Sequence, residues 1–169
     1  KLRVFRNAKF FKTDIQGKCD SITFNDKDSI LRMHENPVIW NNQSQLTADD
    51  LYFTMRNGVL DSIFMIKNAF ILSQVDLIKY DQVRGKTMKG KFNNGSLNSM
   101  YVSGNGQTVY TITDEGVQQG VNRADCSDII VRFKQGEISK VVFITKPNAK
   151  MYPLNEIPEG ELFLKGFSP

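Results

Sequence analysis

A short asparagine motif that recurs along the whole chain is the strongest constraint on what it can fold into. Asparagine is followed by a compact residue, a variable residue and then mostly apolar residues, as in NAKFF, NPVIW, NAFIL, NGQTVY and NAKMY. The copies begin at residues 7, 36, 68, 105 and 148, with spacings of 29, 32, 37 and 43 residues. Asn tolerates a left-handed backbone and bonds its own neighbouring backbone, and a compact next residue suits a tight bend. The motif therefore predicts strands that all bend sharply at equivalent places.

Two other signals recur in a fixed order around this motif. The first is a polar turn followed by an apolar strand, at 27–33, 57–65, 94–102 and 135–143. Two of these turns, Asn57-Gly58 and Asn94-Gly95, favour the positive φ angles of two-residue hairpins. The second signal is a small residue and a polar pair that open another strand, as in CDSITF, ADDLYF and CSDIIV, with a degenerate copy, MKGKF, near residue 88. Such ordered recurrence predicts an internally repeated, nearly all-β chain.

Alternation within the strands predicts which side chains share a face of the sheet. Arg32, Phe64 and Tyr101 are expected on one face, and apolar columns on the other. The residues expected to line the apolar face are Ile22, Phe24, Leu31, Met33, Leu51, Phe53, Ile63, Met65, Ile71, Met100, Val102, Ile129, Val131 and Phe143. A sheet whose strands bend at one column becomes a two-walled slot. Two alternatives stay open: side chains fill the slot, as in a β-solenoid or small jelly roll, or it holds an apolar ligand.

Composition and charge exclude several classes of protein. The 169 residues show no break in composition, which favours one domain, and no apolar run approaches the ~20 residues of a spanning helix. Lys and Arg are scattered among Asp and Glu, and the net charge is +4, so a mixed solvated surface is favoured and nucleic acid is disfavoured. The first residues lack a signal-peptide pattern, so we expect a mature chain or a piece of a longer one.

Residues that could carry catalysis or bind metal are few. His34 is the only histidine, which argues against a metal site or a Ser-His-Asp triad and favours a structural or exposed side chain. Cys19 and Cys126 occupy positions equivalent to Ala48, which indicates small-residue packing. Repetition in every unit favours turn roles over paired catalytic carboxylates for Asp20, Asp49, Asp50 and Asp128. The sequence therefore predicts a protein that is not an enzyme, with no cofactor and no metal.

The order G-x-C/A-D-x-I, hairpin, apolar strand, N-A/P, strand resembles the OstA/LptA family of lipopolysaccharide transport proteins. IQGKCDSITF, SQLTADDLYFTM and IKNAFILS carry this resemblance, which covers about residues 1–152 and is greatest to the OstA-like proteins. It implies an antiparallel β-jellyroll, or β-taco, of folded strands with an apolar interior slot. It also implies a location in the periplasm of a Gram-negative bacterium.

The resemblance further implies a function and partners. The slot would shelter the lipid A acyl chains of lipopolysaccharide, and domains would stack head to tail through edge strands, with copies of this chain or with other Lpt-type proteins. The first alternative is the periplasmic domain of the outer-membrane translocon, which is LptD-like and shares the fold. The second is a structural β-repeat scaffold with a filled core, which recruits other proteins by strand addition.

Two segments depart from the repeat. In RGKTMKGKF, Gly90 and Lys91 replace the expected polar-apolar start, which predicts an interrupted or remodelled slot in the third unit. The tail, residues 153–169, contains Pro153, Pro158 and Pro169 and lies outside any repeat. We expect a division into jellyroll repeats at 1–152 and this tail, which would pack over the end of the slot or, alternatively, dock a partner.

Overall fold

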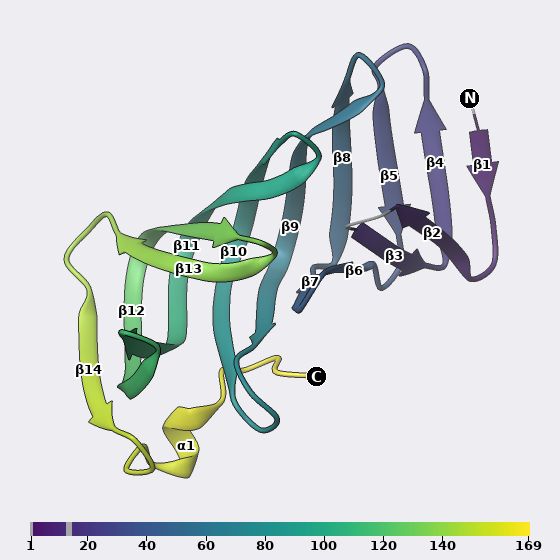
Figure 1. Cartoon of the computed structure of the whole chain (residues 1–169). Helices are drawn as coiled ribbons and strands as arrows, with labels where there is room; N and C mark the ends of the chain where they lie inside the picture. Colours follow the sequence, from purple (N-terminus) through teal and green to yellow (C-terminus); the bar gives the residue numbers. More distant parts are fainter. Residues whose placement is uncertain (1, 13–14) are drawn as a thin grey trace.

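The computed structural model describes residues 2–12 and 15–169 and consists mainly of one antiparallel sheet of fourteen strands (Figure 1). One short helix is present among these residues, α1 (Glu159–Leu162), and it lies near the C-terminus. The strands are β1 (Leu2–Val4), β2 (Ala8–Lys12), β3 (Ile15–Cys19), β4 (Ser21–Asn25), β5 (Ile30–His34), β6 (Val38–Asn41), β7 (Ser44–Thr47), β8 (Asp50–Arg56), β9 (Val59–Gln74), β10 (Tyr80–Asn93), β11 (Ser96–Asp114), β12 (Val117–Lys134), β13 (Glu137–Phe143) and β14 (Asn148–Pro153).

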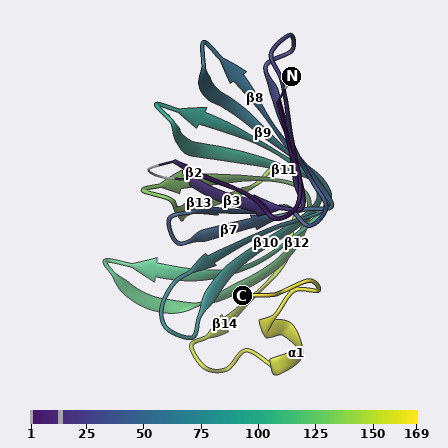
Figure 2. The same ribbon diagram turned by 90° about the vertical axis from the view of Figure 1, so that its right-hand side faces the viewer.

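The sheet forms two walls that share its longest strands. The first wall follows the order β1-β4-β5-β8-β9-β10-β11-β12-β13. The second wall follows β2-β3-β6-β7-β9, continues through β10 and β11, and ends with β14 paired to β12. Strands β9 to β12 bend midway, so one half of each strand belongs to the first wall and the other half to the second wall. Figure 2 shows the strands spreading from a common line, as expected for a sheet folded along one column.

The predicted asparagine bends are present in four of the five copies. The backbone is left-handed at Asn7, Asn36, Asn68 and Asn105, with φ between 49° and 54°. The residue before each of these also has a positive φ, so a pair of left-handed residues makes each bend. Asn148 is different, because its φ is not positive and it already pairs with Asp125 in β14. The chain turns just before it, at residues 144–147, where Pro147 restricts the backbone of its neighbour.

The expected interruption at Gly90 and Lys91 is wrong. The third copy of the small-residue signal begins at Gly85, where β10 bends, and Met88 then takes the position that Leu51 has in the second copy. Gly90 stays in register opposite Ile63, and a Cβ on it would lie 2.5 Å from Ile63 Cγ2. Glycine is therefore required there by close packing, and the apolar row continues through this unit.

The outer face of the first wall carries a ladder of aromatic and cationic side chains. The Tyr52 and Phe64 rings stack with centroids 4.6 Å apart. The Arg32 guanidinium lies 5.1 Å from the Tyr52 ring, and the Lys89 ammonium lies 5.2 Å from the Phe64 ring. Tyr101 follows as the cross-strand neighbour of Lys89. The predicted placement of Arg32, Phe64 and Tyr101 on the face opposite the apolar columns is confirmed.

The tail does not pack over the end of the slot, so that expectation is wrong. It covers the outer face of the second wall, where Leu164 joins an apolar cluster with Phe70, Leu72, Val109 and Val121. In β9 the run Ala69 to Leu72 is apolar on both faces, with Ala69 and Ile71 turned toward the slot and Phe70 and Leu72 turned away. A strand that is apolar on both faces is covered on both faces, and the tail supplies the second cover.

Candidate functional site

The inner face of the first wall carries two continuous apolar rows. Cross-strand register gives the row farther from the bends as Phe24, Leu31, Phe53, Ile63, Gly90, Met100, Val131 and Val141. The row nearer the bends is Ile22, Met33, Leu51, Met65, Met88, Val102, Ile129 and Phe143. Thirteen of the predicted slot residues occupy these rows and therefore share one face of the first wall, and all of them except Phe24 belong to its apolar cluster or pack against it. Their contact with a ligand stays a prediction.

The inner face of the second wall contains slot residues that are not among those predicted from the sequence. Ile71 was the only residue predicted there, and its row continues on either side through Leu46, Ile39 and Val83. Phe10 completes this row by lying over Gly17, where a Cβ would come within 2.8 Å of Ile39 Cδ1. The short strands VIWN and SQLT alternate as half-buried strands do, and this signal could have identified Ile39 and Leu46.

The two walls pack directly against each other in this structure. The centroid of the Phe53 ring, on the first wall, lies 6.2 Å from that of Phe10 on the second wall, and the two rings meet edge to face. The centroid of the Phe92 ring lies 6.0 Å from that of Phe53. Met65 and Ile71, from opposite walls, are both 0% exposed and belong to one cluster. The interior is therefore filled by side chains where these residues meet, and an apolar ligand would have to replace contacts between the walls.

The open edge of the slot, opposite the bends, is held by hydrogen bonds between two turns. The Ser44 hydroxyl donates to the Gly136 carbonyl (2.8 Å), and its Oγ lies 3.0 Å from Ser73 Oγ. The Asn42 amide donates to the Gln135 carbonyl at 3.3 Å. Ser44 and Asn42 belong to the second wall, whereas Gln135 and Gly136 form the β12–β13 turn of the first wall. We call this set of contacts the seam.

The inner row of the second wall that lies nearest the seam is polar. Cross-strand pairing and strand alternation place Asn41, Ser44, Ser73, Asp81, Tyr110 and Asn122 in this row. Asp81 Oδ1 accepts a hydrogen bond from the Thr111 amide at 2.7 Å, and burial raises the Asp81 pKa to about 7. Asn41 Nδ2 and Asn122 Oδ1 are buried and have no hydrogen-bond partner within residues 2–12 and 15–169. The slot therefore combines an apolar floor with polar groups next to its seam.

The residues considered for catalysis or metal binding have structural contacts. His34 Nε2 lies 3.1 Å from the Thr23 hydroxyl, and the Asn68 amide donates to the Asp49 carboxylate (3.1 Å) at a bend. Cys19 and Cys126 are free and buried. Their strands are separated by six strand spacings, or roughly 29 Å, which is too far for a disulfide. Within residues 2–12 and 15–169, no group of three or more His, Cys, Asp or Glu side chains could hold a metal ion.

Among the described residues, no helix has the length and apolar character needed to span a membrane. No protein-family model matches the chain, and no curated protein matches it in sequence. Its structure is similar to that of LptH, the LptA-homologous periplasmic component of the lipopolysaccharide transport device of Pseudomonas aeruginosa. The match covers 82% of this chain and 93% of LptH, with a TM-score of 0.58 and 15% sequence identity. The antiparallel β-jellyroll predicted from the sequence is confirmed, and the chain has an LptA-like fold.

Proposed function

We propose that the chain is a periplasmic lipopolysaccharide-binding protein that shields lipid A acyl chains between its two walls, as part of a bridge between the inner and outer membranes. One observation carries the proposal: two apolar rows on the first wall face an apolar row on the second wall. Acyl chains exposed to water cost roughly 25 cal/mol per Å² of apolar surface, so transfer across an aqueous gap needs such a cover. The fold shared with LptH, a transport component, supports the same role.

Binding in the slot requires the walls to separate. The interior side chains contact one another, so acyl chains would replace apolar contacts with other apolar contacts while the seam opens. Four methionines in the first-wall rows, Met33, Met65, Met88 and Met100, have flexible side chains that repack around chains of different shape. The polar row beside the seam would then face the amide and ester groups where acyl chains join the sugars.

Site-specific photocrosslinking tests the proposal. A photoreactive amino acid at Phe53 or Met65, inside the slot, should capture lipopolysaccharide in cells. The matched controls are Phe64 and Tyr101, which lie on the same strands or the same wall but point outward. Equal capture at inward and outward positions, or none at either, would contradict a slot-bound lipid.

Head-to-tail assembly is a separate part of the proposal. The walls end in β1 and β2 at one side and in β13 and β14 at the other, and each of these is an edge strand. Edge strands offer unpaired backbone groups to another chain. We expect oligomers whose size grows with concentration and shrinks when a proline is placed in β14, as measured by analytical ultracentrifugation. A strictly monomeric chain at high concentration would argue against stacking.

The packed interior favours one alternative, a structural scaffold whose core stays filled. In that case β1, β2, β13 or β14 would recruit other proteins by strand addition. The two functions differ in the crosslinking experiment, because a scaffold would give protein adducts at its edges and no lipid adduct at Phe53. A translocon domain shares the fold and is distinguished by covalent continuity with an outer-membrane protein.

A further inference from the structure

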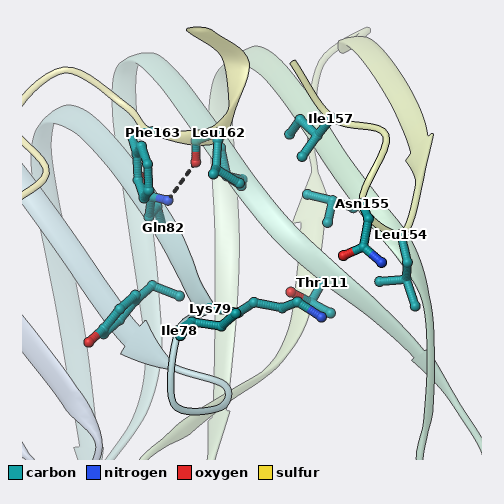
Figure 3. A pocket seen from close by; sticks show the side chains of 12 residues that line it. Ile78, Lys79, Gln82, Thr111, Leu154, Asn155, Ile157, Leu162 and Phe163 are labelled. Atoms are coloured by element: carbon teal, nitrogen blue, oxygen red, sulfur yellow. Dashed lines mark hydrogen bonds between the residues drawn. The ribbon is translucent and has the colours of Figure 1, made fainter. Parts of the chain in front are cut away.

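A cavity of about 320 Å³ lies outside the slot, between the outer face of the second wall and the C-terminal segment (Figure 3). Val109, Thr111 and Val121 form its floor on β11 and β12, and Leu154, Ile157 and Leu162 line it from the tail. The volume is at the lower end of the ~300–1,000 Å³ typical of small-molecule sites. The slot residues described above do not line it, so a ligand here would be additional to one in the slot.

The tail wall of the cavity is fixed by specific bonds. Gln82, which is 1% exposed, donates from its amide to the Leu162 carbonyl (3.0 Å) and accepts from the Leu164 amide (2.8 Å). Glu161 Oε2 lies 3.5 Å from Nε of the half-buried Arg123. These contacts attach α1 and the residues after it to the second wall, so the cavity between them is part of the folded structure.

Lys79, which lines the cavity, lies beside polar groups of neighbouring residues. The Asp76 carboxylate accepts hydrogen bonds from the Ile78 and Lys79 amides at 3.0 and 2.9 Å. The Lys79 ammonium, which points along the cavity in Figure 3, donates to Gln118 Oε1 at 2.7 Å. It lies 3.8 Å from Asp76 Oδ2. The side chain of Lys79 is 29% exposed and its ammonium has three hydrogens, so a ligand acceptor could share it with Gln118 and Asp76.

The lining chemistry favours an alkyl chain over an aromatic group. The two aromatic side chains at the cavity, Tyr80 and Phe163, already pack against Phe167, with ring centroids 5.6 and 4.4 Å from it. The other apolar side chains are aliphatic, and they offer no ring for stacking. Ile78 stands at the mouth and is 78% exposed, which extends the apolar surface outward.

We propose that this cavity binds the single alkyl chain of a small amphiphile whose head accepts a hydrogen bond from Lys79. Carboxylate and phosphate heads share this acceptor chemistry. The inference does not depend on lipid binding in the slot, because different residues and the opposite face of the second wall are involved.

Calorimetric titration with decanoate, below its micellar concentration, tests the proposal. We expect saturable binding of one decanoate, weakened at least tenfold by Thr111→Phe, which fills the cavity. Val121→Phe fills it from the neighbouring strand and serves as the second variant if Thr111→Phe melts at a lower temperature than the wild type. Lys79→Met keeps the apolar stem, and it should weaken decanoate about tenfold while leaving decanol binding unchanged. Lys89→Met, on the outer face of the first wall, is the matched control and should bind decanoate normally.

Several results would overturn the proposal. One is the absence of saturable decanoate binding, and another is unchanged binding by a folded cavity-filling variant. Binding that Lys79→Met and Lys89→Met weaken equally would show general attraction to positive charge. A last result concerns the slot. If lipopolysaccharide displaces decanoate and the cavity-filling variants still bind it, decanoate lies in the slot. That result would overturn this inference and leave the proposed function intact.

Discussion

The Ser44 hydroxyl on the second wall donates a hydrogen bond to the Gly136 carbonyl on the first wall, and this 2.8 Å contact joins the walls at the open edge of the slot. The bends hold the opposite edge covalently, so only non-covalent contacts resist separation of the walls at the seam. Ser44 is fully buried, and its loss would leave the Gly136 carbonyl without this partner. The seam is therefore where opening for a lipid would start.

Weakening the seam should lower stability and speed lipid capture. In the double variant Asn42→Gly and Ser44→Ala, two hydrogen bonds between the walls are lost, at about 1 kcal/mol each, and glycine suits the left-handed backbone at Asn42 (φ 52°). We expect the free energy of unfolding to fall by roughly 2 kcal/mol in urea denaturation, and lipopolysaccharide crosslinking at Phe53 to become faster. Ser139→Ala is the control, because the Ser139 hydroxyl bonds Arg132 within the exposed face of one wall. Equal effects of the double variant and the control would show that the seam does not hold the walls together.

Thr108 provides a test of the polar groups inside the fold. Its hydroxyl is buried with no hydrogen-bond partner among the described residues, whereas the Thr23 hydroxyl is 3.1 Å from His34 Nε2. Thr108→Val removes an unpaired polar atom at nearly constant volume, so stability should be unchanged or rise by about 1 kcal/mol. Thr23→Val removes a paired hydroxyl and should cost about 1 kcal/mol. Urea denaturation of both variants measures the contrast, and a larger loss for Thr108→Val than for Thr23→Val would mean that the Thr108 hydroxyl has a partner.

Asp81 should make the stability of the fold depend on pH. Burial raises its folded-state pKa to about 7, above the ordinary value of 3.8 in the unfolded chain. The folded state therefore binds the proton more tightly, so the stability contributed by protonation is complete below about pH 4 and is lost as pH rises toward 7. The full difference corresponds to roughly 4 kcal/mol at about 1.4 kcal/mol per pH unit.

The substitution Asp81→Asn should remove this pH dependence. The asparagine side-chain oxygen still accepts a hydrogen bond from the Thr111 amide, and no charge is buried, so the variant should be more stable than the wild type at pH 8 and similar to it at about pH 3.5, below the unfolded-state pKa. Urea denaturation at both pH values measures the difference. Asp114→Asn, at an exposed strand end, is the control and should leave the pH profile of the wild type unchanged. An Asp81→Asn variant with the same pH profile as the wild type would show that Asp81 titrates normally.

The register of the first wall could be predicted from the sequence because the repeat aligns equivalent residues. Alternation placed Ile22, Leu51 and Ile129 in one column and Met33, Met65 and Val102 in another, and antiparallel pairing merges these columns into a single row. Met88 also lies in this row but is not among the predicted slot residues. The signal there is weak because Gly85 takes the place of the Cys or Ala that marks the other copies.

Periodicity could have identified part of the second wall. Ile39 and Leu46 lie in the short strands β6 and β7, and the alternation of these strands would have assigned both residues to the inner face. The contact of Phe10 with Phe53 joins residues more than forty positions apart and depends on how the walls close, which alternation within a strand does not encode. The same reason explains why the filled interior and the position of the tail were beyond the pattern.

The bend at Asn68 gives the final prediction, which concerns the motif itself. Asn68 has φ 49°, and its amide donates to both Asp49 carboxylate oxygens at 3.1 Å. Asn68→Gly keeps a residue suited to positive φ and loses only the hydrogen bonds, so it should cost about 1 kcal/mol. Asn68→Ala also introduces the strain of a left-handed alanine, which should lower the free energy of unfolding by about 1 kcal/mol more. The expected order of stability in urea denaturation is wild type, Asn68→Gly, Asn68→Ala.

Asn148 supplies a control for this prediction from within the same motif. It is also followed by alanine, but it lies in β14 without a positive φ, so Asn148→Ala should change the free energy of unfolding by less than about 0.5 kcal/mol. If left-handed geometry is the reason the motif recurs, the cost of alanine must depend on φ and not on the motif. Equal losses for Asn68→Ala and Asn148→Ala would contradict that explanation. So would an Asn68→Gly variant that is no more stable than Asn68→Ala, because the bend would then gain nothing from a residue that accepts positive φ.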